Sequence, residues 1–128
     1  MEKERYEQLA KIIFISALEV HKQMGPGLLE STYHHALAHE LKLQNIPSRS
    51  EVKVPLFYKG ISTGKEFYID ILVENEIIVE LKSVDELLPI HMAQLINYLK
   101  LSDKRMGFLI NFNVPLIKEG FRRVVKKY

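Results

Sequence analysis

The sequence of 128 residues predicts an α/β fold in which helices flank a central mixed β-sheet. Three observations lead to this fold class. Apolar residues recur at helical spacing in three segments, over residues 4–23, 28–43 and 89–101. In residues 52–58 an apolar or aromatic residue recurs at every second position, as in a strand, at Val52, Val54, Leu56 and Tyr58. The segments 67–73 and 77–82 are apolar on both faces apart from three charged residues, as expected of central strands that helices cover.

Two helices are expected first. Residues 4–23 carry Leu9, Ile13 and Val20 on one helical stripe, and the Pro and Gly residues of 24–27 disfavour its continuation. A second helix is expected over 28–43, and Asn45-Ile46-Pro47 ends it.

The strands and the third helix follow in order. The strand over 52–58 closes at a turn near Lys59-Gly60, and residues 67–73 and 77–82 form the two arms of a hairpin. A third helix over 89–101 has Pro89 at its first turn. A strand over 106–112 follows this helical crossover, so we expect it to run parallel to the strand over 77–82. Residues 121–125 are expected to form a short strand or an edge segment. The length supports one core, so we expect a single domain over residues 1–128.

The composition limits the possible function. The chain contains no cysteine, which excludes disulfides and thiolate metal sites. No apolar run reaches the roughly 18 residues that span a bilayer, and the start lacks the features of a signal peptide. We therefore expect a cytoplasmic protein that does not enter the membrane.

The net charge is only +2, so charge alone does not predict a nucleic-acid-binding protein. Basic residues nevertheless cluster, at Arg122, Arg123, Lys126 and Lys127 and around Lys100, Lys104 and Arg105. These clusters could neutralise phosphates, or they could be solvated ends that aid solubility.

The hairpin carries the most informative charges. Glu80 and Lys82 are two residues apart on one strand and must point the same way. If a three-residue loop is centred on Asn75, Asp70 lies directly opposite Glu80, with Cβ atoms roughly 5 Å apart. A two-residue turn at Asn75-Glu76 would instead place the two acids on opposite faces.

Two opposed carboxylates on a buried sheet require a positive charge nearby. Lys82 supplies one, and a hard divalent cation on carboxylate oxygens would supply the rest. The alternative is a structural ion pair between Glu80 and Lys82, with Asp70 on the surface near a turn.

Three motifs then carry a family resemblance. Asp70 followed by Glu80-Leu81-Lys82 resembles the bipartite signature of the PD-(D/E)xK nuclease superfamily, although Ile69 stands where that signature has Pro. Gly27 to Tyr33 resembles the Gly-x-x-Glu-x-x-Tyr motif that names a small bacterial family within this superfamily. Gln94 to Tyr98 resembles the Gln-x-x-x-Tyr helix motif of RecB-type nucleases.

The resemblance implies a three-layer restriction-endonuclease-like core of αβββαβ order and a metal-dependent hydrolase that cuts phosphodiester bonds. It implies Mg²⁺ or Mn²⁺ on Asp70, Glu80 and Glu30, with Lys82 polarising the attacking water or stabilising the developing negative charge. Nucleic acid is the expected partner, DNA rather than RNA, and a homodimer or a protein partner could supply further grip.

The remaining candidate residues lie on helices and at the C-terminus. By the resemblance, Gln94 would orient the attacking water or a phosphate oxygen. Tyr98 would support Lys82 or a backbone phosphate, or be a core aromatic. Tyr33 would pack in the core or touch substrate. Arg122 and Arg123 would contact the substrate.

Other interpretations stay open. His35 and His39 lack the intervening glutamate of the zinc-protease pattern, so a zinc site with His34 is disfavoured. The chain could be a catalytically silent nucleic-acid-binding or protein-assembly module on a nuclease scaffold, since fold does not guarantee function. It could also be a structural domain in which the acids and Lys82 form a buried network.

Overall fold

A computed structural model describes residues 1–126, so Lys127 of the predicted basic cluster lies outside the described residues. The elements along the chain are α1 (Lys3–Met24), α2 (Glu30–Leu43), β1 (Ser48–Tyr58), β2 (Ile61–Val73), β3 (Ile77–Lys82), α3 (Pro89–Ser102), β4 (Met106–Asn111), the 3₁₀ helix η1 (Ile117–Gly120) and β5 (Phe121–Val125). Over this part of the chain, no helix combines the length and the apolar character that crossing a bilayer requires.

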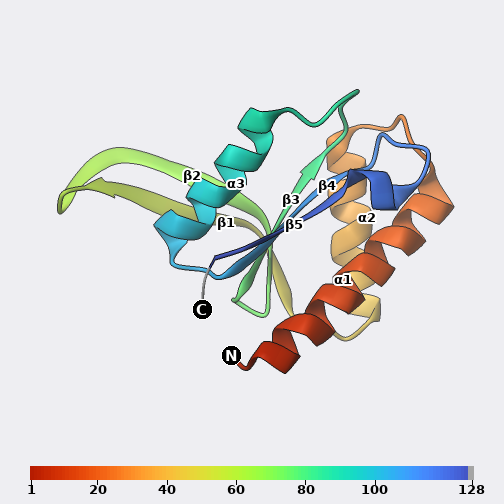
Figure 1. Cartoon of the computed structure of the whole chain (residues 1–128), viewed down its shortest axis with the longest axis horizontal. Coiled ribbons are helices and arrows are strands. Elements are labelled where there is room, and N and C mark those ends of the chain that lie inside the picture. Colours follow the sequence, from red (N-terminus) through yellow and green to blue (C-terminus); the bar gives the residue numbers. More distant parts are fainter. Residues whose placement is uncertain (127–128) are drawn as a thin grey trace.

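The five strands form one sheet in the order β1-β2-β3-β4-β5, with helices on both sides (Figure 1). One apolar cluster joins α1 and α2 to one face of the sheet, through residues such as Leu9, Tyr33 and Phe108. A second cluster joins α3 to the other face, through Leu95, Leu99 and Ile78. The predicted α/β fold with a helix-flanked mixed sheet is therefore confirmed.

The central strands pair as the sequence predicts. β3 and β4 are parallel, while β1–β2, β2–β3 and β4–β5 are antiparallel. All residues of β3 and β4 are buried except Lys82, which is half-buried. A charged group on β3 therefore sits on the most enclosed part of the sheet.

The turn between β2 and β3 has the three residues that place Asp70 opposite Glu80. Glu74 and Asn75 adopt φ values of +48° and +59°, and the Glu76 N–H donates to the Val73 carbonyl at 2.9 Å. The pairs Val73–Ile77 and Ile71–Val79 fix the register. Its continuation by one residue sets Asp70 against Glu80, as expected for a three-residue loop and not for the two-residue turn at Asn75-Glu76.

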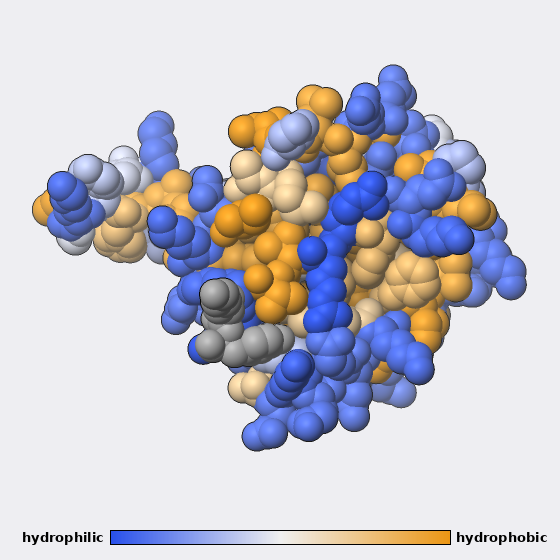
Figure 2. Space-filling view, in the orientation of Figure 1, coloured by the Kyte–Doolittle hydropathy of each residue, from blue (hydrophilic) through white to orange (hydrophobic). Residues whose placement is uncertain are grey.

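The hairpin of β1 and β2 is longer than the sequence suggests. β2 begins at Ile61 rather than at Phe67, because the polar and small residues at 62–64 hide a strand pattern. A bulge sets three residues of β2, 63–65, against Leu56 of β1. Residues 52–69, which we call the arm, pack against α3 at their base, and their tip extends well beyond the rest of the molecule (Figures 1 and 2).

The arm is turned relative to the strand segments from which it extends. Phe67 and Ile69 pack in the cluster beneath α3, whereas Ile71 and Val73 pack in the cluster beneath α1 and α2. Residues two apart on a regular strand share a face, so the alternation breaks at Asp70. On β1 the break falls at Glu51, which adopts φ +53° between the Ser50–Ile71 and Val52–Ile69 pairs.

Close backbone approach fixes the C-terminal edge of the sheet. A Cβ added at Gly120 would lie 2.1 Å from the Asn111 carbonyl oxygen. The end of η1 therefore packs directly against the end of β4, and only glycine fits there.

We predict that Gly120→Ala destabilises the protein, because the backbone of Asn111 would have to move. Overpacking of this kind costs about 1–3 kcal/mol, and contact with backbone rather than a side-chain end favours the upper part of that range. Urea unfolding followed by circular dichroism would measure it. Lys118→Ala, an exposed position in the same 3₁₀ helix, is the control. Equal stability of the two variants would contradict the close approach.

Candidate active site

The two carboxylates of the hairpin lie where β2 separates from β3. Backbone pairing between these strands ends at Ile71 and Val79. At the next position the side chains take over: the Asp70 N–H donates to Glu80 Oε2 at 2.8 Å, and the Leu81 N–H donates to Asp70 Oδ2 at 2.9 Å. Each acid thus binds the backbone of the opposite strand.

These reciprocal bonds explain how the strands can part without leaving buried donors unpaired. Buried backbone N–H groups need acceptors, and a carboxylate is a strong one. Each carboxylate is fixed by one oxygen, so the two groups are held side by side before any ligand arrives.

Burial makes Glu80 an unusual acid. The residue is only 8% exposed, and its pKa is raised from 4.5 to about 8, with burial as the largest cause. The neighbouring Asp70 charge and a hydrogen bond between the two side chains add to the rise in pKa, while the Asp70 N–H and the Lys82 charge oppose it. Near neutral pH the pair therefore holds a proton, as two carboxyls in close contact do.

Lys82 lies beside this pair without a direct ion pair. It is half-buried and points to the same face as Glu80, two residues earlier. Among the described residues, no salt bridge joins Lys82 to Glu80 or Asp70. The structural ion pair between Glu80 and Lys82, which was the alternative interpretation, is therefore not formed among the described residues.

The start of α2 completes a hollow next to Asp70. A hollow of about 430 Å³ is lined by Leu29, Glu30, Ser31, His34 and Asp70. Glu30, the first residue of α2, is exposed at its rim. Partial burial raises the pKa of Glu30, Lys82 lowers it and Asp70 raises it, so the three charges interact.

A hydrogen bond ties this end of α2 to the strand that carries Glu80. The Ser83 hydroxyl donates to the Leu28 carbonyl at 2.6 Å, directly after Lys82 and directly before the N-cap residue Leu29. The residue that directly follows β3 therefore helps to set the position of Glu30 relative to the carboxylate pair.

His34 is a site residue that the sequence analysis considered only for zinc. It lines the hollow, and its Nε2 is buried without a hydrogen-bond partner among the described residues. His34 follows Glu30 by four residues, so both lie on one side of α2. This spacing is a sequence signal that could have predicted His34 as a site residue.

Tyr98 on α3 covers the carboxylates from the other side. Its ring stacks on Phe67 at the base of the arm, with ring centroids 3.9 Å apart. Burial raises the Tyr98 pKa, and the charges of Glu80 and Asp70 raise it further, so the hydroxyl lies near both acids. Gln94 is exposed one turn earlier on the same helix.

Tyr33 packs in the core. It is fully buried, and its ring stacks on Phe112 at 4.5 Å. Its hydroxyl donates to the Gly25 carbonyl at 2.5 Å and accepts from the Leu28 N–H at 3.1 Å. Tyr33 thereby holds the loop that leads into Glu30.

The two predicted arginines lie on opposite faces of the sheet. Leu109 pairs with both Glu80 and Arg122, which puts Arg122 on the same face as Glu80, about 10 Å away across two strands. Arg123 is on the other face, where it forms an ion pair with Glu7 of α1.

Asn111 positions the segment that follows Lys82, and the sequence analysis did not single it out. It is 2% exposed and pairs with Lys82 in the sheet. Its side chain accepts from the Val84 N–H at 3.1 Å and donates to the Val84 carbonyl at 2.9 Å. A lone amide at the end of an apolar strand is the signal that could have found it.

Asp70 and Glu80 are the residues of the site that suit a divalent metal ion. Within residues 1–126, no three His, Cys, Asp or Glu side chains are grouped closely enough to hold one ion. Without a third ligand, Asp70 and Glu80 still offer two adjacent carboxylates. They share a proton, and a bound cation could take the place of that proton. Two carboxylates, with water and substrate phosphate, are a common set for Mg²⁺.

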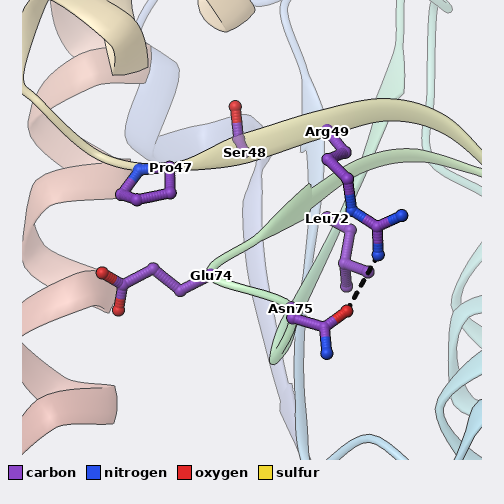
Figure 3. Close-up of a pocket in the computed structure, with 6 residues that line it drawn as sticks. All are labelled: Pro47, Ser48, Arg49, Leu72, Glu74 and Asn75. Carbon is purple, nitrogen blue, oxygen red and sulfur yellow. Dashed lines mark hydrogen bonds between the residues drawn. The ribbon is translucent and has the colours of Figure 1, made fainter.

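A second hollow, of about 500 Å³, lies at the other end of the β2–β3 hairpin and shows no such chemistry (Figure 3). Its charged side chains are already paired: Arg49 donates to Asn75 at 2.9 Å, and Glu74 forms a 2.7 Å ion pair with Arg5. The carboxylate pair is therefore the better candidate site.

Comparison with known proteins agrees with this geometry. The family model described as the PD-(D/E)XK nuclease superfamily matches residues 7–124. This match covers most of the chain, and the protein belongs to the PD-(D/E)XK nuclease superfamily. No curated protein and no solved structure matches it significantly.

We predict that Glu80 makes the metal-free protein less stable as the pH rises from about 5 to 8. Its raised pKa means that the folded state holds a proton that the unfolded state releases above pH 4.5, so this stabilisation is lost as the pH approaches and passes about 8. Glu80→Gln does not titrate and can still accept the Asp70 N–H.

Urea unfolding in chelator at several pH values would test this. Relative to the wild type, Glu80→Gln should gain stability toward pH 8, by up to about 1.4 kcal/mol for each pH unit between pH 5 and 8. The exposed Glu119→Gln should track the wild type. Parallel curves for wild type and Glu80→Gln would contradict the raised pKa.

Proposed function

We propose that this protein is a metal-dependent nuclease that hydrolyses phosphodiester bonds of nucleic acid. Membership of the superfamily suggests nuclease activity in general. The observation that carries the specific proposal is the pair of carboxylates, each held by the backbone of the opposite strand, with Lys82 beside them. Burying two adjacent carboxylates lowers the stability of the fold unless a cation binds them.

Asp70 and Glu80 would hold Mg²⁺ or Mn²⁺, with Glu30 joining directly or through water. When bound, the ion would lower the pKa of a water molecule and neutralise charge on the scissile phosphate. The reciprocal hydrogen bonds fix the carboxylates in advance, so little reorganisation is needed at the moment of reaction.

Lys82 would act on the water or on the phosphate. Its ammonium has no ion-pair partner among the described residues, and the flexible stem of a lysine would let it donate to either oxygen. Tyr98 would orient Lys82 or a phosphate through its hydroxyl, and exposed Gln94 would position water or a phosphate oxygen. Arg122, on the same face as Glu80, would contact the substrate backbone.

Within the superfamily, we place the chain in the bacterial Gly-x-x-Glu-x-x-Tyr family, on the motif from Gly27 to Tyr33. The roles of that motif are then distinct: Glu30 would face the metal, while Tyr33 holds the loop before it. We propose DNA as substrate ahead of RNA and a cytoplasmic location.

The second candidate function is a catalytically silent binding or assembly module. One observation favours it: in the part of the chain that the structure describes, Glu30 does not join Asp70 and Glu80 in a ready-made ligand group. Metal binding and cleavage separate the two functions.

We predict that millimolar Mg²⁺ or Mn²⁺ raises the melting temperature of the wild type, because an ion that binds only the folded state stabilises it. Asp70→Asn should lose this shift, since the amide keeps the hydrogen bond from Leu81 but not the charge. Differential scanning fluorimetry would measure both. A shift of the same size in Asp70→Asn would place the ion elsewhere, and no shift in the wild type would favour the silent module.

We predict metal-dependent cleavage of labelled nucleic acid by the wild type. Single-stranded, duplex and branched DNA and RNA should each be incubated with Mg²⁺, Mn²⁺ or chelator. Asp70→Asn and Lys82→Met should each lose at least about 100-fold in rate, the usual effect of removing one preorganised charged group. Lys11→Met, an exposed lysine on α1, is the control. Activity retained by either site variant would refute the assignment.

A further inference from the structure

We infer that the arm is a binding surface for an unpaired segment of the nucleic acid that the active site cuts. This inference rests on the proposed function and names the form of its substrate. Its basis is the set of side chains that the arm exposes and the position of Asp70 at its base.

Aromatic and apolar side chains at the tip of the arm are exposed to solvent. Phe57 is 61% exposed, Tyr58 66% and Ile61 72%, and Tyr68 is 52% exposed nearer the base. Aromatic rings in water favour stacking partners, and nucleobases stack on them whatever their sequence. Bases inside a duplex are already stacked, so these rings suit unpaired bases.

Lysines accompany the rings. Residues 52–69 contain Lys53, Lys59 and Lys65, all exposed, against the single acid Glu66. The Lys59 ammonium lies 5.5 Å from the centre of the Tyr58 ring. Lys53 is paired with Tyr68 across the hairpin, so ring and cation share a face there too. Cations beside exposed rings are the usual surface for single strands.

The same residues argue against sequence reading in a duplex. A two-stranded ribbon can enter the major groove, where the bidentate readers of base edges are Arg or Lys on guanine and Asn or Gln on adenine. Residues 52–69 contain no Arg, Asn or Gln, and the Lys59 ammonium lies over the Tyr58 ring. The arm therefore suits phosphates and base faces rather than base edges.

A second copy of the chain is a poorer occupant. β1 is an edge strand, and edge strands invite pairing with another copy unless they are blocked. Pro55 has no N–H to donate, and Arg49, Glu51 and Lys53 place charges along the same edge. These are the features that prevent strand addition.

The arm also leads directly to the site. Ile69, its last residue, precedes Asp70, and Phe67 within it stacks on Tyr98. From Glu51, beside Asp70, to Tyr58 at the tip, seven steps of about 3.4 Å give a reach of about 24 Å. A strand lying on the arm would enter the active site at Asp70.

Binding in chelator tests this separately from cleavage. Fluorescence anisotropy would compare labelled single-stranded, overhang and duplex oligonucleotides over a range of salt. Phe57→Ser/Tyr58→Ser should bind single strands at least about tenfold more weakly, with a smaller change for duplex. Leu43→Ser/Leu116→Ser, which removes exposed apolar side chains elsewhere, is the matched control.

The lysines have their own test. Lys59→Gln/Lys65→Gln should weaken binding and lower the salt slope by about 1.4, the value for two phosphate contacts on a single strand. Lys11→Gln/Lys118→Gln, on the body of the protein, should leave the slope unchanged.

The outcomes distinguish this inference from the proposed function. Loss of single-strand binding in the arm variants supports the inference even if the wild type cuts nothing, in which case the nuclease proposal alone fails. Arm variants that bind like the wild type overturn the inference even if the wild type is an active nuclease. A wild type that binds no oligonucleotide overturns it as well. So does a serine variant that converts a dimer into a monomer in sedimentation while its binding is unchanged, because the arm would then be a self-contact.

Discussion

The site depends on the exchange of hydrogen bonds between Asp70 and Glu80 at the point where β2 leaves β3. A sheet cannot open within a folded protein unless the freed N–H groups find acceptors. Here the acceptors are the two acids themselves. The structural need to part the strands and the chemical need to fix two carboxylates are met by the same two bonds.

The other site residues are held by elements that contact this point from different sides. Ser83, directly after Lys82, fixes the start of α2 through Leu28, and Asn111 fixes Val84. Tyr98 is held by its stacking on Phe67. Because β3 and β4 are almost wholly buried, these contacts lie around the most enclosed part of the sheet.

Much of this could be predicted from the sequence because it depends on local pattern. The alternation of apolar residues located the hairpin, and a three-residue turn at Asn75 was one of the two turns considered. This turn is the one that sets Asp70 against Glu80. The full arm could not be predicted, because Ser62, Thr63 and Gly64 give no apolar alternation. The change of face at Glu51 could not be predicted either, since it rests on a positive φ at a residue type that seldom adopts one. Asn111 and His34 each carry a local signal, but their positions in the site depend also on Val84 and Asp70, which are distant from them in sequence.

The tip of the arm makes little contact with either apolar cluster, and this has an evolutionary consequence. Residues 57–65 contribute no side chain to the clusters beneath the helices. Changes of length or composition in such an exposed loop cost little in folding free energy. The tip can therefore diverge faster than the body, and related chains could acquire different targets by exchanging a few residues there while the chemistry at the base stays constant.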